Sequence, residues 1–401
     1  MNILIVASKF PPEYTGPGVR IPRLYEDIRE ELGINRVDVL CNGVEHTKNE
    51  DYEYKNSHVK RRAAAYIREN NFPFSIMPKK IKNALVFFAE NIITLRALNA
   101  YNHTFDLIHI IGHSGGTAAA LHWAKKNDVP VLMELVNATA LPEQRFLFFS
   151  KVRPSNAFKI IVISNELKKK SMSLGFKEKD IWSRPNPVDE AVFHPQETLK
   201  ETYRKNICPF ANDDVVICSV AKFMSRKNQI FLLEVMPFLS NKYKLLLAGP
   251  VIEKGDFLSR DREYVSKIKN KIAKLKLEYR VHMAVGFVDS DAYIKASDVY
   301  ALPAWDEGLG TPMLEALACG IPVVANIEEA AFQQWIKNGD NGFLSAIDNP
   351  QDWAKAIEKL AALSKDKRQN IAPHIHAQAG QKEIHQKYKI LIKELTSHCS
   401  Q

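Results

Sequence analysis

Residues 298–326 read DVYALPAWDEGLGTPMLEALACGIPVVAN, a pattern that predicts a strand, a loop, a helix and a second strand. The first apolar run ends at Pro303, and the segment TPMLEALACG has a proline near its start and a glycine after its end. Helices commonly have a proline near their first position and a glycine just after their last. Glu307 lies in the loop, and Glu315 follows eight residues later inside the predicted helix. A strand, a helix and a strand in this order indicate a parallel sheet.

The same alternation of short apolar strands and amphipathic helices extends over the whole chain and occurs twice. Strands are predicted at 2–8, 36–42, 106–112, 129–136 and 159–164, and again at 214–223, 243–249, 280–288, 298–303 and 321–326. A length of 401 residues suits two domains. We therefore expect an α/β chain with two Rossmann-like, doubly wound domains, residues 1–190 and 191–379, followed by a helix at about 380–398.

The composition indicates an ordinary globular protein, with 46% hydrophobic and 25% charged residues. No segment reaches the roughly 18 uninterrupted apolar residues of a membrane span, and the apolar N-terminal run lacks the basic residues of a signal peptide. The five cysteines are scattered and form no Cys-x-x-Cys pair: Cys41, Cys208, Cys218, Cys319 and Cys399. We expect a cytoplasmic chain with no metal site and no resident cofactor.

A glycine-containing loop and a basic loop each follow a predicted strand, where parallel sheets bind their ligands. Gly16 and Gly18 open a predicted helix, so the backbone there could approach a phosphate closely. Ordinary loop glycines explain this segment equally well. Lys222 and Lys227 follow the first strand of the second domain and would suit a diphosphate. An ordinary basic loop would have the same sequence.

The two glutamates of residues 298–326 indicate a ligand that has both an anion and hydroxyl groups. The helix start offers the backbone N–H groups of Gly310 and Thr311 to an anion. Glu315, within the first two turns, can accept two hydrogen bonds from a cis-diol such as ribose. Glu307 lies before the turn and can reach the other end of the ligand. Each glutamate alone is more often a surface residue, but together they favour a nucleotide-sugar.

Residues 307–325 resemble the E-x7-E signature of retaining nucleotide-sugar glycosyltransferases of the GT-B fold, in particular glycosyltransferase family 4. Further segments that fit this family occur in the expected order: the glycine loop 16–18, FDLIHIIG at 105–112, RPNPVD at 184–189, the Lys222/Lys227 pair, LLLAG at 245–249 and NGFLSAIDNP at 341–350. The resemblance implies two facing Rossmann-like domains and a donor held mainly by the C-terminal one. It also implies that the terminal helix crosses back to the first domain.

By the same resemblance, Lys222 and Lys227 hold the donor diphosphate, Glu315 holds the ribose, and Glu307 holds the hydroxyls of the transferred sugar. Lys222 departs from the family, which usually has an arginine there that could bind bidentately. Pro187 also departs from it, because it replaces a glycine and stiffens a turn.

A third departure concerns the transferred sugar. Family members commonly have a histidine near it, and the corresponding residue here is Val136. Glu134, Asn137 and, from the preceding loop, His113 are the candidate sugar or acceptor contacts that remain. A loop histidine without function would occur there just as readily.

The donor chemistry defines the expected reaction. Cleavage of the anomeric C–O bond leaves negative charge on the nucleoside diphosphate, which Lys222, Lys227 and the helix start can stabilise in place of a divalent metal. The resemblance implies retention of anomeric configuration through front-face attack, with no protein nucleophile. Two alternatives remain open: a binding or scaffold protein of the same fold that lost its chemistry at Val136, and a sugar-nucleotide epimerase. The sequence does not identify the donor base, the donor sugar or the acceptor.

The net charge of +9 is concentrated in residues 55–96. Nine lysines and arginines there face two acidic residues, for a net of +7 before histidine, and aromatic residues lie between the cations. One interpretation is a solvated helical face. The other is an interfacial segment on an anionic membrane, at the inner face of the cell membrane, where a glycan or lipid-linked acceptor would be found. No nucleic-acid-binding motif accompanies the charge, so we expect no nucleic-acid partner.

Overall fold

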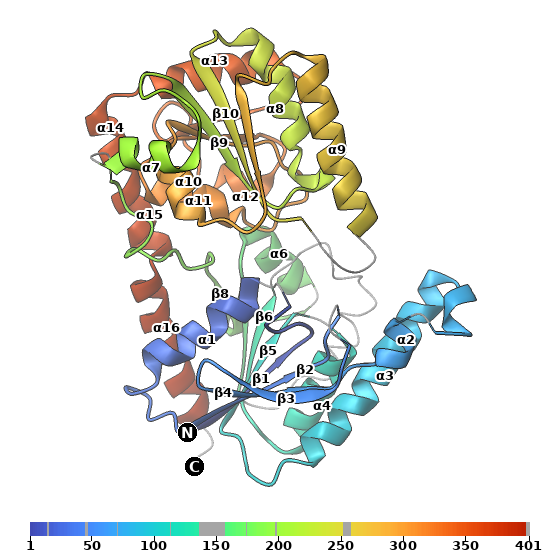
Figure 1. Cartoon of the computed structure of the whole chain (residues 1–401). Coiled ribbons are helices and arrows are strands. Elements are labelled where there is room, and N and C mark those ends of the chain that lie inside the picture. The colour runs from blue at the N-terminus through green and yellow to red at the C-terminus, as the bar shows by residue number, and fades with distance from the viewer. Residues whose placement is uncertain are drawn as a thin grey trace. The chain divides into compact units, whose positions relative to one another are not determined.

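The computed structural model describes residues 1–13, 16–44, 47–69, 71–112, 114–135, 157–173, 175–196, 199–251 and 258–397 (Figure 1). The chain divides into two compact units. Unit 1 comprises Met1–Arg184 together with Ile384–Gln401, and unit 2 comprises Pro185–Glu383. The sequence places the corresponding boundaries at 190 and 380.

Unit 1 contains an eight-stranded sheet in the order β3-β4-β2-β1-β5-β6-β7-β8. All neighbouring strands are parallel except β3 and β4. The central strands are continuous apolar runs, as expected where helices cover both faces of a sheet. The strands are β1 (Asn2–Ala7), β2 (Arg36–Cys41), β3 (Glu50–Tyr54), β4 (Ser57–Arg61), β5 (Leu107–Ile111), β6 (Val131–Leu135), β7 (Phe158–Val162) and β8 (Ile181–Ser183).

The helices of unit 1 include the C-terminal helix, which contributes to the same core as β1. Ile384, Tyr388, Ile392 and Leu395 recur at helical spacing, and all four are buried in that core. The elements are α1 (Gly16–Ile28), α2 (Ala65–Arg68), η1 (Phe74–Ile76), α3 (Lys79–Asn99), α4 (Gly115–Lys126), α6 (Asn165–Ser173), η2 (Glu178–Asp180) and α16 (Gln381–Ser397). The predicted return of the terminal helix to the first domain is confirmed.

Unit 2 contains a six-stranded, fully parallel sheet in the order β11-β10-β9-β12-β13-β14. Its strands are β9 (Val215–Val220), β10 (Tyr243–Gly249), β11 (Val281–Val285), β12 (Val299–Leu302), β13 (Val323–Asn326) and β14 (Gly342–Ser345). Its helices are α7 (Lys200–Ile207), η4 (Ser225–Lys227), α8 (Gln229–Val235), η5 (Met236–Phe238), α9 (Leu258–Lys274), α10 (Ser290–Lys295), α11 (Thr311–Ala318), α12 (Ala330–Gln333), α13 (Pro350–Ala361), α14 (Lys365–Gln369) and α15 (Ile371–Ala379).

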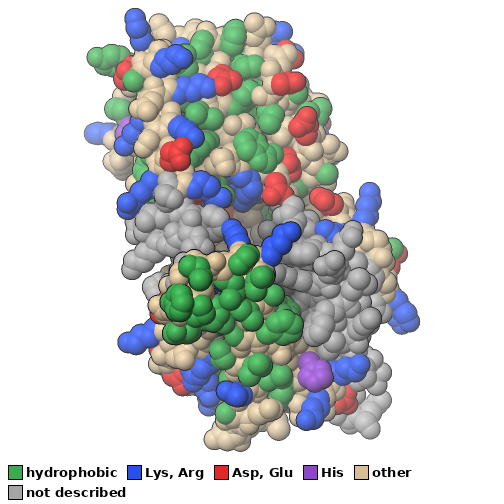
Figure 2. Space-filling model, turned by 90° about the vertical axis from the view of Figure 1, so that its right-hand side faces the viewer, with side chains coloured by type: hydrophobic (Ala, Val, Ile, Leu, Met, Phe, Trp, Pro, Cys, Tyr) green, Lys and Arg blue, Asp and Glu red, His purple; other side chains and the backbone are tan. Residues whose placement is uncertain are grey.

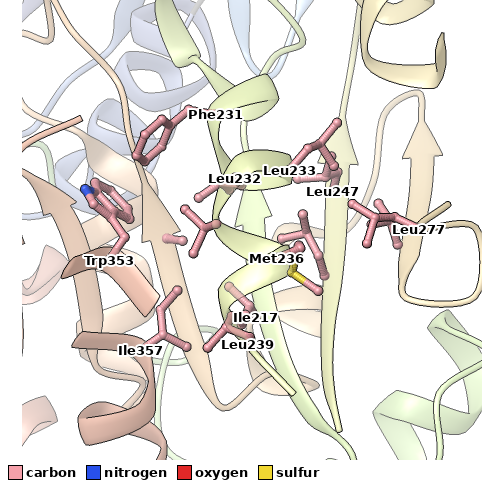
Figure 3. Packing of buried hydrophobic residues seen from close by; sticks show 14 of the residues in the cluster. Ile217, Phe231, Leu232, Leu233, Met236, Leu239, Leu247, Leu277, Trp353 and Ile357 are labelled. Atoms are coloured by element: carbon pink, nitrogen blue, oxygen red, sulfur yellow. The ribbon is translucent and has the colours of Figure 1, made fainter. Parts of the chain in front are cut away.

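The core of unit 2 is centred on Trp353 of α13, which is fully buried (Figure 3). Its ring meets Phe231 of α8 edge to face, with the ring centroids 5.3 Å apart. Its indole N–H donates to the carbonyl oxygen of Ala346 at 2.9 Å, so the one polar atom of the ring is satisfied. Aliphatic side chains from β9 and β10, such as Ile217 and Leu247, belong to the same buried cluster. This packing fixes two helices against the central strands.

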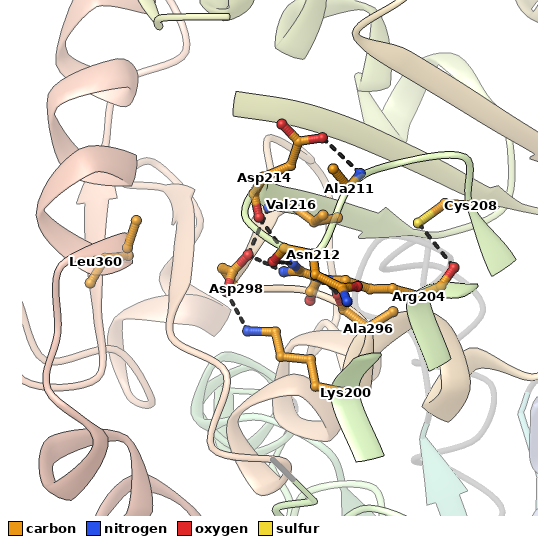
Figure 4. A network of polar contacts seen from close by, with 12 residues as sticks. Lys200, Arg204, Cys208, Ala211, Asn212, Asp214, Val216, Ala296, Asp298 and Leu360 are labelled. Carbon is orange, nitrogen blue, oxygen red and sulfur yellow. Dashed lines mark hydrogen bonds and ion pairs between the residues drawn. The ribbon is translucent and has the colours of Figure 1, made fainter. Parts of the chain in front are cut away.

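Asp298 ties the amino ends of β9 and β12 together (Figure 4). Its carboxylate accepts hydrogen bonds from the backbone N–H of Val216 at 2.7 Å and from Arg204 Nη2 at 2.5 Å, and it pairs with Lys200. The backbone N–H of Asp298 donates to the carbonyl oxygen of Val216 at 2.8 Å. The Asp298 carboxylate and backbone thus fix the two strands to each other at their starts.

Each sheet has a point at which the direction of chain progression reverses. In unit 2 the chain runs outward from β9 through β10 and β11, and then returns to β12 on the other side of β9. In unit 1 the same reversal separates β1 from β5. Doubly wound sheets bind ligands outside the carboxyl ends of the strands at this switch point. The loops after β9 and β12, and those after β1 and β5, are therefore the places to examine.

Among the helices that the structure describes, none combines the length and the apolar character needed to cross a membrane.

Candidate functional site

The loop after β9 carries the predicted phosphate-binding lysines. The side-chain amide of Gln229, at the start of α8, donates to the carbonyl oxygen of Lys222 at 3.0 Å and so fixes the backbone there. Lys227 ends the short helix η4, and Asn228 after it adopts a left-handed conformation with φ of 51°. That turn redirects the chain into α8. Local hydrogen bonds thus position both lysines beyond the end of β9.

The loop after β12 meets the loop after β9 through Glu307. Its carboxylate accepts a hydrogen bond from Arg226 Nη1 at 2.5 Å and another from Lys227 Nζ. Arg226 Nη1 also donates to the carbonyl oxygen of Asp306 at 3.1 Å, and the backbone N–H of Trp305 donates to the carbonyl oxygen of Arg226 at 3.0 Å. Burial lowers the pKa of Lys227, an effect that the Glu307 carboxylate opposes. Two loops 80 residues apart therefore form one charged cluster at the switch point.

Glu329 holds the Glu307 loop from its other side. Its carboxylate accepts hydrogen bonds from the backbone N–H groups of Asp306 at 2.6 Å and Glu307 at 3.1 Å. Asp306 has a φ of 57°, a left-handed conformation that aspartate tolerates better than most residues. Glu329 lies between β13 and α12, so the ends of three neighbouring strands contribute to the position of Glu307.

Helix α11 begins beside this cluster, as the sequence predicts. Gly310 is its N-cap residue and has a φ of 76°. A Cβ atom at Gly310 would lie 2.6 Å from Cε1 of Phe332, so both the backbone conformation and the packing require glycine there. The Thr311 hydroxyl accepts a hydrogen bond from Asn186 Nδ2 at 2.9 Å. The segment RPNPVD thus reaches the start of α11, a contact that the sequence did not predict.

Glu315 lies on α11 and is partly buried. Burial, followed by the charge of Asp291 on α10, raises the pKa of the Glu315 carboxyl to about 7. Near neutral pH this carboxyl is therefore divided between its charged and neutral forms. Both Glu315 and Glu307 add to the effect of burial in raising the pKa of the Tyr300 hydroxyl, which places Tyr300 within electrostatic reach of both glutamates.

The structure distinguishes the two predicted lysines by their partners. Lys227 pairs with Glu307, whereas Lys222 Nζ lies 3.5 Å from Oδ2 of Asp261 on α9. The side chains of Lys222 and Arg226 keep 24% and 32% of their surface exposed, so a ligand can reach both. At the carboxyl ends of β9 and β12 the structure brings together four of the predicted residues: Lys227, Glu307, Gly310 and Thr311. Lys222 lies on the same loop as Lys227.

In unit 1 the glycine loop also lies at a switch point. Gly16 begins α1 after β1, as predicted, and it is exposed, whereas Gly18 is buried. Arg20 follows on the same helix and donates to both carboxylate oxygens of Glu134 on β6, at 3.3 and 2.6 Å. Arg184 Nη2 donates to the same carboxylate at 2.8 Å. The glycine loop is thereby anchored to the strand that ends next to it.

Glu134 itself has no exposed surface. It also accepts a hydrogen bond from the Tyr388 hydroxyl of α16, and His109 Nε2 lies 3.3 Å from its Oε1. Burial alone would raise the pKa of Glu134, but Arg184 and Arg20 hold it well below its usual value. A sugar cannot reach a carboxylate that is enclosed and already paired. We therefore correct the expectation that Glu134 contacts sugar or acceptor and assign it to an interior ion network.

The other two candidate contacts, His113 and Asn137, lie outside the described residues, as does Val136.

With this geometry established, the chain can be compared with known proteins. Residues 201–375 match the family model of glycosyl transferases group 1, a segment that contains the whole Lys227–Glu307 cluster and α11. The two Rossmann-like sheets give the chain the GT-B fold, as predicted.

Solved structures of glycosyl transferases support the fold over almost the whole chain. Sucrose-phosphate synthase from Thermosynechococcus elongatus superposes with a TM-score of 0.76 at 18% identity and covers 99% of both chains. Anabaena HepE in complex with UDP and glucose superposes with a TM-score of 0.72 at 15% identity and covers 98% of this chain and all of HepE. Identities this low establish the fold alone.

Among curated relatives, the lipopolysaccharide core biosynthesis glycosyltransferase LpsE of Rhizobium meliloti is 30% identical over 150 residues, which are 37% of this chain and 40% of LpsE. The chain spans about half or less of the length of the first curated relatives that it matches.

Sequence reasoning noted Arg226 between Lys222 and Lys227 in the basic loop but gave it no role of its own. It missed three contributors to the site: Glu329, Asn186 and Asp291. Asn186 lies in RPNPVD, a segment noted for its family resemblance and its proline but not for this residue. Glu329 and Asp291 act through a backbone contact and a long-range charge. No local pattern in the sequence signals either of them.

Proposed function

We propose that the chain transfers a sugar, with retention of anomeric configuration, from a nucleoside-diphosphate sugar to a glycan or lipid-linked acceptor. The observation that carries the proposal is the cluster of Lys227, Arg226 and Glu307 at the switch point of unit 2, beside the start of α11. Cations and a helix start suit a diphosphate, and Glu315 on the same helix suits the diol of a ribose.

In this proposal the diphosphate binds to Lys222, Lys227 and the amino end of α11. Arg226 adds a guanidinium that can bind two phosphate oxygens at once. Glu307 pairs with both Arg226 and Lys227 and so holds the two cations close together. Cations that are held by the protein itself need little reorganisation during the reaction.

The reaction forms a bond between the acceptor oxygen and the anomeric carbon and breaks the bond from that carbon to the phosphate oxygen. The acceptor proton passes to a donor phosphate oxygen on the same face, so no protein nucleophile is needed. The negative charge that develops on the departing diphosphate lies against Lys222 and Lys227, which stabilise it in place of a divalent metal. Glu307 orients the hydroxyls of the transferred sugar.

Two named relatives support the choice of substrates. HepE has been seen with UDP and glucose, and the name of LpsE assigns it to lipopolysaccharide core synthesis. By analogy, we propose a nucleotide-sugar donor and an acceptor in cell-envelope polysaccharide or glycolipid synthesis, at the cytoplasmic side of the membrane.

A donor screen tests the proposal. The chain is incubated with UDP-, GDP- and ADP-sugars, with and without candidate acceptors, and nucleotide release is measured. Acceptor-dependent release is expected for one donor, it should persist in EDTA, and NMR of the product should give the anomeric configuration of the donor. Release or isomerisation without acceptor would instead identify a hydrolase or an epimerase. Donor binding without turnover in the presence of every acceptor would identify a binding protein.

A further inference from the structure

In the part of unit 1 that the structure describes, helix α3 packs against α4 through one face. A Cβ atom at Gly115 of α4 would lie 1.8 Å from the carbonyl oxygen of Phe87, so the two helices pack with their backbones in contact. Asn91 Nδ2 donates to the carbonyl oxygen of Gly115 at 3.2 Å. Glu90, Thr94 and Leu98 on this inner face are buried. The orientation of α3 about its own axis is therefore fixed.

The opposite face of α3 carries apolar side chains in solvent. Ile81, Leu85, Phe88 and Ile92 are spaced by four, three and four residues, so they form one stripe along the helix. Ile81, Phe88 and Ile92 have 52%, 64% and 52% of their surface exposed. A helix that only had to cover α4 would place polar residues on this stripe.

The segment before α3 extends the stripe into a patch. Tyr66, Phe72 and Ile76 are 61%, 74% and 76% exposed. The Tyr66 hydroxyl donates to the carbonyl oxygen of Phe72 at 3.0 Å, and the Tyr66 ring meets Phe74 edge to face at 5.6 Å, so α2 and η1 are held together. Figure 2 shows hydrophobic side chains gathered over the face of unit 1 that α3 occupies, with Lys and Arg side chains at its edge. We call this surface the α3 patch. It consists of Tyr66, Phe72, Ile76, Ile81, Leu85, Phe88 and Ile92.

The exposed charges around the α3 patch are mainly positive. Glu69 is the one exposed carboxylate within residues 66–92, and it accepts a hydrogen bond from the Thr47 hydroxyl at 2.6 Å. Residues 70–89 contain three lysines and no carboxylate. Lys79 and Lys80 are exposed in the first turn of α3, where a cation opposes the helix dipole and so carries no benefit to the helix itself. The position of these lysines is therefore better explained by a partner that binds this end of the helix.

The basic surface is narrower than residues 55–96, the range expected from the sequence. Arg61 is fully buried and pairs with Glu50 of β3, Arg62 pairs with Asp51, and Arg68 pairs with Glu90. Lys60 lies over the Tyr101 ring, 4.1 Å from its centroid. These contacts neutralise or cover most cations of the first half of the basic stretch. Lys79 and Lys80 at the start of α3 remain exposed, as do Lys55 and Arg96 at the two ends of the stretch.

We propose that the α3 patch binds the surface of a membrane that contains anionic lipid. Aromatic and aliphatic side chains would enter the interface while Lys79 and Lys80 meet the negative headgroups. A second copy of the chain fits less well, because a two-fold contact would bring the lysines of both copies together, and Glu69 is the one exposed carboxylate within residues 66–92 that could lie between them. The proposal of a lipid-linked acceptor rests on the proposed function. The proposal that the α3 patch binds lipid does not rest on it.

Vesicle sedimentation tests the proposal with the full chain and no donor. Vesicles of phosphatidylcholine alone are compared with vesicles containing 30 mol% phosphatidylglycerol at low and high salt. The chain should sediment with anionic vesicles only, and high salt should release it, because surface attraction is screened within a Debye length. Each lysine contributes about fivefold to partitioning, so removal of two should reduce it on the order of 25-fold, and Lys79→Glu with Lys80→Glu, which reverses both charges, should reduce it by at least that factor.

Matched controls separate the patch from overall charge and overall apolarity. Lys269→Glu with Lys274→Glu on α9 makes the same charge change at exposed positions of unit 2 and should leave sedimentation within about twofold of wild type. Phe88→Ser with Ile92→Ser should abolish binding, whereas Tyr279→Ser, which removes a 92% exposed aromatic from unit 2, should not. Circular dichroism and nucleoside-diphosphate binding verify that each variant is folded.

Equal recovery on neutral and anionic vesicles, or no loss in the α3 variants, would overturn the proposal. So would a dimer that Phe88→Ser with Ile92→Ser converts to a monomer while vesicles bind neither form, since the patch would then be a self-association surface. Acceptor-dependent nucleotide release, measured separately in detergent with a soluble acceptor, reports on the proposed function alone. Failure of one proposal is thus distinguishable from failure of the other.

Discussion

Glu134 in unit 1 and Glu307 in unit 2 both lie near the carboxyl end of a parallel strand and both face two cations. Glu134 has no exposed surface, and it contacts arginines from α1 and the end of β8, a tyrosine from α16 and a histidine from β5. Glu307 contacts Arg226 and Lys227 of one loop, and Arg226 remains a third exposed. The same residue types thus form a closed structural network in one unit and, in the other, a cluster that reaches solvent through Arg226, whereas the Lys227 and Glu307 side chains are 11% and 8% exposed. Solvent access and the number of internal partners make the difference.

The largest expected effect tests the closed network. Glu134→Ala should lower the free energy of unfolding by about 3–5 kcal/mol, because it leaves the buried guanidiniums of Arg20 and Arg184 without a counter-ion. Urea denaturation of the full chain measures this change. Glu307→Ala is the matched variant and should cost less, since Arg226 can turn to water and only Lys227 is then left as a buried cation without its carboxylate. Equal losses in the two variants would remove the distinction between network and site.

The next effect concerns the cations of the open cluster. Lys222→Ala and Lys227→Ala should each lower turnover at least ~10-fold, because each removes ~1.4 kcal/mol or more of charge stabilisation from the leaving group. Steady-state nucleotide release measures this effect. Lys269→Ala on the exposed face of α9 is the control and should retain the wild-type rate. Full activity in both loop variants would refute the phosphate-binding role.

The two glutamates of unit 2 should differ in the kinetic constant that they affect. Glu315→Ala should weaken nucleoside-diphosphate binding about tenfold, because a ribose contact is present in both the ground state and the transition state. Glu307→Ala should mainly lower turnover, since the Glu307 carboxylate orients the transferred sugar. Calorimetry with the nucleoside diphosphate, combined with kinetics, tests both. Unchanged affinity in Glu315→Ala would contradict the ribose assignment.

The smallest effect is a pH dependence of donor affinity. With a pKa of about 7 for Glu315, the ionised form that accepts hydrogen bonds from the ribose increases about threefold from roughly pH 6.5 to roughly pH 7.5. Affinity should rise by that factor. Asp291→Asn should weaken the rise by lowering the pKa of Glu315, and Glu315→Gln should abolish it. Titration of the nucleotide phosphates is common to all variants and cancels in the comparison. A rise that persists unchanged in Glu315→Gln must come from another group.

Periodicity and turn residues predicted most of the fold. The apolar runs of ten strands in the sheets, the helix from Thr311 and the helix from Gly16 were all predicted in place. Four strands were not predicted: β3, β4, β8 and β14. β8 has only three residues and β14 only four, while β3 alternates between charged and aromatic residues at the exposed edge of its sheet. Strands this short or this polar lack the continuous apolar run that identifies a buried parallel strand.

The sequence alone determined which residues could perform chemistry at unit 2, because Glu307, Glu315, Lys222 and Lys227 follow strands and open helices, and those positions are encoded locally. Only the tertiary structure decided what each of them contacts. Glu307 meets Lys227 because β9 and β12 are neighbours at the switch point, and Lys222 pairs instead with Asp261. Tertiary structure also reassigned Glu134, since burial depends on α1, β5 and α16 meeting around it. Charge and helix polarity are properties of a short segment, whereas desolvation and pairing depend on residues that are distant in the chain.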